Sequence, residues 1–191
     1  SSLGAPQAGS PILYSAPDGV LIPFDVGAND TYVTPPGTAD RLVATASGYS
    51  LTRPNGEVLG FNQKGQMVSL RDRNCLGLSY VHDAHGQVSS ITDASGHVIS
   101  LVYSGGRVSD AALSDGRSVH YEYSGGLLTS VTDTRGNTTT YGYDPAGRLA
   151  TITNQEGSTI VENVYDEGGR VVHQTNGVGD VAHFSYSADA V

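Results

Sequence analysis

Few residues of this chain have types and spacings that could support catalysis or metal binding. His82 and His85 flank Asp83 and could together contact a metal ion. Two ligands three residues apart within a turn make a poor tetrahedral set without distant partners, so exposed turn residues are the simpler interpretation. The neighbours Asp166 and Glu167 could be imagined as an acid–base pair, but adjacent side chains on a strand or turn diverge. We therefore expect no metal, no cofactor and no catalytic residue.

The only cysteine, Cys75, excludes an intrachain disulfide. Its apolar neighbours Leu76 and Leu78 predict a small buried residue. A reactive thiol would need a base or a cation beside it, and Arg71 and Arg73 are close only in sequence. Nucleophile-elbow, P-loop and dinucleotide-binding patterns do not occur in a strand–turn–helix setting. An enzyme is therefore disfavoured.

Composition and charge restrict the class of protein further. Among 191 residues there are 25 glycines and 11 tyrosines, and 38% are hydrophobic, a mixture that favours strands and tight turns. The net charge of −9 leaves no basic stripe to neutralise phosphates, which argues against nucleic acid. No apolar run approaches the ~20 residues of a membrane span, and the first residues lack a signal-peptide pattern. An acidic surface with a single lysine, Lys64, favours a secreted protein.

Two sets of glycines recur from residue 86 onward. In five successive units the second glycine follows the first by 10 residues, and a tyrosine closes the unit 7 or 8 residues later. The first glycines are Gly86, Gly106, Gly126, Gly147 and Gly169, the second are Gly96, Gly116, Gly136, Gly157 and Gly179, and the tyrosines are Tyr103, Tyr123, Tyr143, Tyr165 and Tyr186. A period of about 20 residues predicts stacked copies of one supersecondary unit.

Tight turns explain these glycines. Asp133-Thr134-Arg135-Gly136 and Asp144-Pro145-Ala146-Gly147 share one template, in which the aspartate caps the turn and the glycine takes a positive φ. Ser104-Gly105-Gly106 is a tighter version. A type I turn followed by a left-handed glycine is a common hairpin connection, so each unit is predicted to be a β-hairpin of about 20 residues.

The segments between the turns have strand patterns of two kinds. After the second glycine, apolar residues alternate cleanly, as in Val119, Tyr121 and Tyr123, which indicates one buried face. After the first glycine they stand three apart, as in Leu149 and Ile152, and would lie on opposite faces of a flat strand. Either a β-bulge re-aims one of them or both faces are partly covered. The predicted fold class is all-β, an array of consecutive antiparallel hairpins forming a curved sheet or partial β-shell.

The closing tyrosines would form a ladder along this sheet. Rows of exposed aromatic rings can stack on sugars, which is one interpretation. Because the tyrosines end an alternating apolar face, we favour inward packing on adjacent hairpins, with hydroxyls that reach polar partners. Residues 1–48 differ, because they hold six of the eight prolines and lack the glycine period. We predict a Pro-rich, irregular or β lead-in or cap over 1–48 and the hairpin array over 49–191.

Two segments carry a resemblance to a known family. Tyr143-Asp144-Pro145-Ala146-Gly147-Arg148-Leu149 and Tyr165-Asp166-Glu167-Gly168-Gly169-Arg170-Val171 resemble the tyrosine–aspartate (YD) repeat of the Rhs family, and the likeness covers roughly residues 49–191. Units starting at Tyr80, Tyr103 and Tyr123 keep the spacing but lack the aspartate after the tyrosine. The resemblance implies a large bacterial protein whose hairpin spiral closes into a shell around a C-terminal toxin; teneurins use a related shell in adhesion. An arginine follows the Asp-Pro-Ala-Gly turn, so the family's autocleavage motif is not matched.

These observations predict a structural scaffold, one arc of such a shell, from a secreted, extracellular or cell-surface bacterial protein. A carbohydrate-binding or adhesion module is the alternative, as is a filament subunit that assembles through open strand edges. The expected partners are further repeats of the same or neighbouring chains, with a toxin cargo or a glycan, and neither nucleic acid nor a membrane interior. The expected site residues are structural: the ten glycines, the five tyrosines, Asp144 and Asp166.

Overall fold

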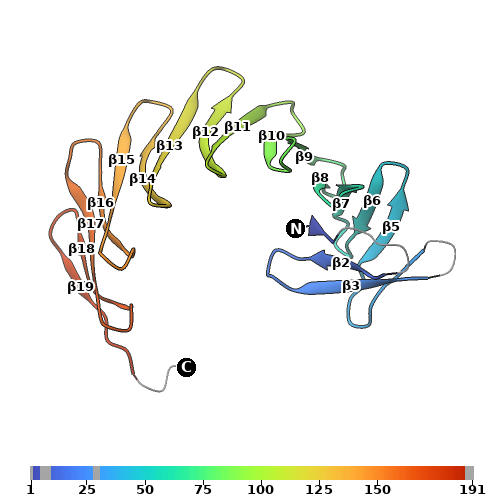
Figure 1. The fold of residues 1–191 in the computed structure, drawn as a ribbon, viewed down its shortest axis with the longest axis horizontal. Helices are drawn as coiled ribbons and strands as arrows, with labels where there is room; N and C mark the ends of the chain where they lie inside the picture. The colour runs from blue at the N-terminus through green and yellow to red at the C-terminus, as the bar shows by residue number, and fades with distance from the viewer. Residues whose placement is uncertain (1, 5–9, 28–30, 188–191) are drawn as a thin grey trace. The chain divides into compact units, whose positions relative to one another are not determined.

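The structure is a computed structural model that describes residues 2–4, 10–27 and 31–187 (Figure 1). Its regular elements are β-strands, so the predicted all-β class is confirmed. The described part of the chain has no helix long and apolar enough to cross a membrane. The chain divides into two compact units, residues 1–100 and 101–191. The predicted domain boundary after residue 48 stays a prediction.

The first unit contains two antiparallel sheets. A small sheet has the order β1-β2-β3-β4, with β1 (Ser2–Leu3), β2 (Ile12–Ser15), β3 (Leu21–Val26) and β4 (Tyr32–Val33). The strands of the larger sheet in this unit are β5 (Arg41–Thr45), β6 (Gly48–Thr52), β7 (Val58–Asn62), β8 (Met67–Arg71), β9 (Gly77–His82), β10 (Val88–Thr92) and the start of β11 (Val98–Ser104). Each of these strands pairs with the next strand in sequence.

The hydrophobic core of the first unit lies between the small sheet and β5–β7, and Figure 1 shows β2 and β3 beside β5 and β6. Its buried side chains are Leu3, Ile12, Tyr14, Phe24, Leu42, Leu51, Leu59 and Phe61. The ring of Tyr14 meets that of Phe61 edge-on at 6.2 Å, and its hydroxyl accepts a 2.6 Å hydrogen bond from Arg53. Alternation along β6 and β7 puts one apolar face of each strand into this core.

The second unit is an array of consecutive hairpins. After the end of β11 its strands are β12 (Arg107–Leu113), β13 (Ser118–Ser124), β14 (Leu127–Thr132), β15 (Thr138–Tyr143), β16 (Leu149–Thr153), β17 (Thr159–Tyr165), β18 (Val171–Asn176) and β19 (Val181–His183). From β12 to β19 every strand is antiparallel to its successor. The predicted hairpin array is therefore confirmed.

β-bulges resolve the two alternatives that the sequence leaves open. On β16, the partners of Tyr143 and Gly142 are Leu149 and Thr151, so one residue is skipped. Because of this skip, Leu149 faces Tyr143 and Ile152 faces Tyr141, on the same side of the sheet. The same register shift occurs opposite Phe61, His82, Tyr123 and Tyr165. A bulge, not two covered faces, explains the spacing of three.

A further bulge absorbs the one irregular interval in the repeat. The unit that ends at Tyr165 is one residue longer than the others, and the pairing of β16 with β17 shifts between Ile152 and Thr153. The partners jump from Thr159 to Val161, which leaves Ile160 as the extra residue. The tyrosine therefore keeps its place in the array although the connecting segment is longer.

The turn at Asp72–Cys75 corrects the prediction for the cysteine. Cys75 is exposed, as is Leu76 beside it. Its N–H donates to the carbonyl of Asp72 at 3.0 Å, and its φ is +62°, so it fills the position that glycine fills in the other turns of this type. Among the described residues it alone has a positive φ without being glycine. The turn geometry exposes the thiol and overrides the apolar neighbours.

We predict that Cys75→Gly raises the free energy of unfolding by about 1 kcal/mol. A left-handed conformation costs a residue with a Cβ roughly 1–2 kcal/mol, and the greater freedom of glycine in the unfolded chain offsets part of that gain. The reciprocal Gly136→Cys, at φ +86° with open space around it, should lose a similar amount. Urea unfolding under reducing conditions measures both. Cys75→Ser keeps the Cβ and is the control; a midpoint equal to that of Cys75→Gly would contradict the assigned geometry.

Candidate functional site: the tyrosine, aspartate and arginine ladder

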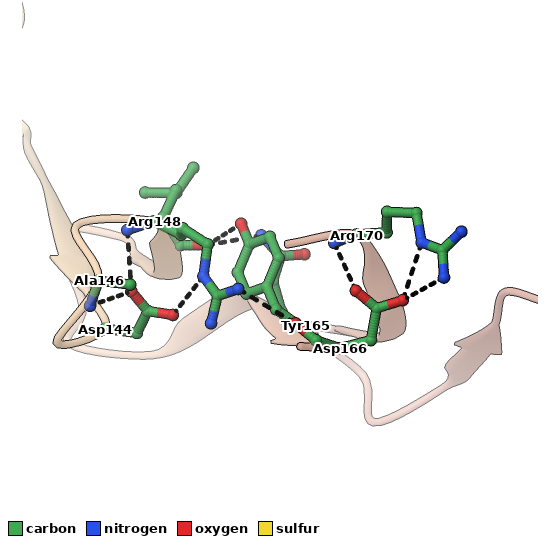
Figure 2. Close-up of polar contacts among 8 residues, drawn as sticks. Asp144, Ala146, Arg148, Tyr165, Asp166 and Arg170 are labelled. Atoms are coloured by element: carbon green, nitrogen blue, oxygen red, sulfur yellow. Dashed lines mark hydrogen bonds and ion pairs between the residues drawn. The ribbon is translucent and has the colours of Figure 1, made fainter. Parts of the chain in front are cut away.

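Each aspartate of the two complete YD motifs caps its own turn (Figure 2). Oδ1 of Asp144 accepts the backbone N–H groups of Ala146 and Arg148, both at 2.9 Å. Oδ2 of the same carboxylate accepts Nε of Arg148 at 2.7 Å. Asp166 repeats this arrangement with the backbone N–H and Nε of Arg170, both at 2.8 Å. One carboxylate thus closes the turn and fixes the direction of the arginine that follows it.

These hydrogen bonds favour the charged form of both aspartates. The backbone N–H of Arg148 is the largest cause that lowers the pKa of Asp144, and the side-chain bond and charge of Arg148 act in the same direction. The backbone N–H of Arg170 lowers the pKa of Asp166 in the same way. Both carboxylates are therefore ionised and engaged at neutral pH, and neither is available as a base.

The arginines connect one hairpin with the next. The guanidinium of Arg148 lies over the ring of Tyr165 at 4.6 Å, and Arg170 lies over Tyr186 at 4.7 Å. Nη1 of Arg148 also donates to the backbone carbonyl of Asp166 at 3.2 Å. Each arginine is held by the turn before it and covers a tyrosine 16 or 17 residues later. This cation–π contact is a nearest-neighbour interaction between repeats.

The tyrosine hydroxyls are also engaged. The hydroxyls of Tyr143, Tyr165 and Tyr186 donate to the carbonyls of Leu128, Leu149 and Val171 at 2.8, 2.7 and 2.8 Å, respectively. In each case the acceptor follows directly the residue at the arginine position, which is Leu127 in the first case. At Tyr165 and Tyr186 the ring is covered by a guanidinium and the hydroxyl is bound to a backbone carbonyl, so these sites join hairpins and position no free nucleophile.

The structure places the predicted site residues as follows. The ten repeat glycines all have positive φ, between +78° and +89°. Tyr103, Tyr143 and Tyr165 are half-buried, whereas Tyr123 and Tyr186 are 37% and 45% exposed. His82 and His85 belong to no group of three His, Cys, Asp or Glu side chains, within the described ranges, that is arranged to hold an ion. Arg148 and Arg170 belong to the YD motif, but sequence reasoning missed their role, which only the structure gives. The sequence signal that could have identified them is their place directly after the turn glycine.

An array of hairpins joined by aspartate-held arginines that cover the next tyrosine defines a scaffold of YD repeats. A profile of the teneurin YD-shell family matches residues 62–185, and the chain belongs to this family. The sequence resemblance to YD repeats is thereby confirmed, and the family is that of a structural shell. A comparison with curated proteins finds no significant match.

Two solved structures share the fold. The crystal structure of TcdB2-TccC3 aligns with 87% of this chain at a TM-score of 0.57 and 16% identity. The Tc holotoxin pore of Photorhabdus luminescens aligns with 87% at the same TM-score and identity. The chain spans 10% and 11% of their lengths, respectively. At this identity the likeness concerns the fold alone.

We predict that Tyr165→Phe lowers the free energy of unfolding by about 1 kcal/mol, because it removes the hydrogen bond to the carbonyl of Leu149 while keeping the ring under Arg148. Tyr141→Phe is the matched control, since Tyr141 lies on the same array and its hydroxyl makes no hydrogen bond to any residue that the structure describes. Thermal unfolding followed by circular dichroism compares them. Equal losses in both variants would show that the hydroxyl bond has no specific role.

We further predict that Asp166→Asn destabilises the protein at neutral pH but much less in acid. The folded-state pKa of Asp166 is lowered, so its contribution is complete above the unfolded value of 3.8 and is lost as the pH falls through the folded-state value. Unfolding midpoints of the wild type and the variant should differ by a constant amount near pH 7 and converge below pH 3.8. A difference that persists unchanged in acid would assign the effect to the amide itself.

Proposed function

We propose that this chain is a segment of the wall of a YD shell, in a large secreted or surface-exposed bacterial protein that encloses and delivers a toxin cargo. The family match and the two Tc toxin structures support this proposal, together with the contacts between successive hairpins. The single observation that carries it is the repeated arginine–tyrosine stack. At Arg148 and Arg170 the cation is neutralised by the aspartate of its own turn and covers the tyrosine of the next hairpin, as a structural contact between repeats requires.

Two further parts of the proposal concern the chain's edges and surface. The small sheet within residues 1–48 acts as a cap: the N–H of Leu3 donates to the carbonyl of Gly65 at 2.9 Å, and the buried side chains of this sheet pack against those of β5–β7. The partners are further repeats, which pair through strand edges. The glycan-binding alternative finds less support, because arginines lie over the rings of Tyr123, Tyr165 and Tyr186.

The test is protease protection in the protein that carries this segment. We expect its cargo region to resist digestion in the native protein and to be degraded after the shell is denatured. Arg148→Ala should weaken the wall and admit the protease sooner, whereas Arg135→Ala, in an exposed turn, should not. A cargo that is digested equally fast before and after denaturation contradicts the proposal. Growth of filaments by the native protein would favour the filament alternative instead.

A further inference from the structure

One arginine of the ladder lacks the partner that the others have. Arg107 follows Gly106 as Arg148 follows Gly147, and its guanidinium lies over the ring of Tyr123 at 5.7 Å. The turn before it is Ser104-Gly105-Gly106, which has no aspartate. No carboxylate of the described residues lies within ion-pair distance of Arg107. Figure 2 shows the two copies in which an aspartate does hold the guanidinium.

This guanidinium borders a cavity of 580 Å³ that is open to solvent and lies between the turns of two hairpins. The same cavity is lined by Ser109, His120, Glu122, Tyr123 and Thr129. Its volume falls within the roughly 300–1,000 Å³ that is typical of small-molecule sites. Charge, hydroxyl groups and an aromatic ring therefore meet in a space of suitable size, at the one copy of the ladder whose cation has no internal counter-charge.

The second charged group of the cavity narrows the class of ligand. Glu122 is 64% exposed, and its Oε2 accepts a 2.7 Å hydrogen bond from Ser130. Its Oε1 lies 3.9 Å from Nε2 of His120, whose Nδ1 is bound to Asp110 at 2.7 Å. The carboxylate of Glu122 can accept hydrogen bonds from hydroxyl groups, but it repels a ligand that carries several negative charges.

We propose that this cavity binds a hydroxylated monocarboxylate of the sugar-acid class, with its carboxylate on the guanidinium of Arg107 and its hydroxyl groups toward Glu122. The planar fork of a guanidinium matches a carboxylate in a bidentate manner, and charge-assisted hydrogen bonds of this type are the strong ones. In the other two copies the fork is already engaged: Arg148 donates Nε to Asp144 and Nη1 to the carbonyl of Asp166, and Arg170 holds Asp166 through Nε and Nη2.

Calorimetric titration of the chain with D-glucuronate tests the proposal, with D-glucose and sulfate as comparison ligands. We expect saturable binding of glucuronate and at least about tenfold weaker binding of glucose, because loss of a charge-assisted pair costs roughly that factor. Arg107→Gln should weaken glucuronate binding by a similar factor. Arg135→Gln removes the same charge from an exposed turn and should leave the affinity unchanged.

A second variant, Ser104→Asp, adds the carboxylate that Arg107 lacks. β11 ends at Ser104 and β12 begins at Arg107, with left-handed Gly105 and Gly106 between them, so positions 104 and 107 face each other across a two-residue turn. Ser104→Asp should therefore pair with Arg107 and abolish glucuronate binding, while thermal unfolding shows a folded protein. Absence of saturable binding, equal affinity in the wild type and Arg107→Gln, or sulfate binding as tight as glucuronate would overturn the proposal.

Discussion

The ladder depends on one constraint: an arginine must leave its turn in a direction that brings it over the tyrosine of the next hairpin. In two copies the aspartate supplies that constraint, because its carboxylate binds both the turn backbone and Nε of the arginine. Arg107, whose turn has no aspartate, lies farther from its ring, at 5.7 Å against 4.6 and 4.7 Å. In residues 101–187 the only buried side chain is Ser130, so no hydrophobic core orders this part of the array. Backbone ladders, cross-strand pairs and the arginine–tyrosine stacks must hold it together, which is the behaviour of a repeat protein with nearest-neighbour coupling.

The bulges are as necessary as the turns. A regular strand after the first glycine would send Leu149 and Ile152 to opposite faces, and the tyrosines at 143 and 141 would lose one of their cross-strand partners. Skipping one residue restores both pairs. The extra bulge at Ile160 has the same effect. It interrupts the regular pairing of the sheet a second time, and Tyr165 thereby stays under Arg148. The register of the tyrosines is thus conserved within the chain at the expense of regular pairing.

Local interactions could be predicted from the sequence, and contacts between hairpins could not. Asp144 and Gly147 define a turn within four residues, so their pattern is sufficient to place the turn. The partner of Arg148 is Tyr165 on another hairpin, and nothing in the motif indicates which neighbour the side chain covers. The spacing of three between the apolar residues after the first glycine is compatible with a β-bulge or with two partly covered faces, and the sequence does not decide between them. The prediction that Cys75 is buried was wrong. Its apolar neighbours suggested burial, whereas its place as the last of the four turn residues Asp72–Cys75 decides its exposure.

Departures from the repeat are where individual copies gain or lose properties. At Cys75 the chain keeps the turn but replaces its glycine. The result is a cysteine with a left-handed backbone conformation and an exposed thiol. At Ser104 it keeps the arginine and the tyrosine but omits the aspartate, and the result is a cation without an internal counter-charge beside a polar cavity. A copy in which every group is paired can only support its neighbours. A guanidinium without an ion-pair partner has donors left for a ligand, so recognition in such an array is expected at the incomplete copies.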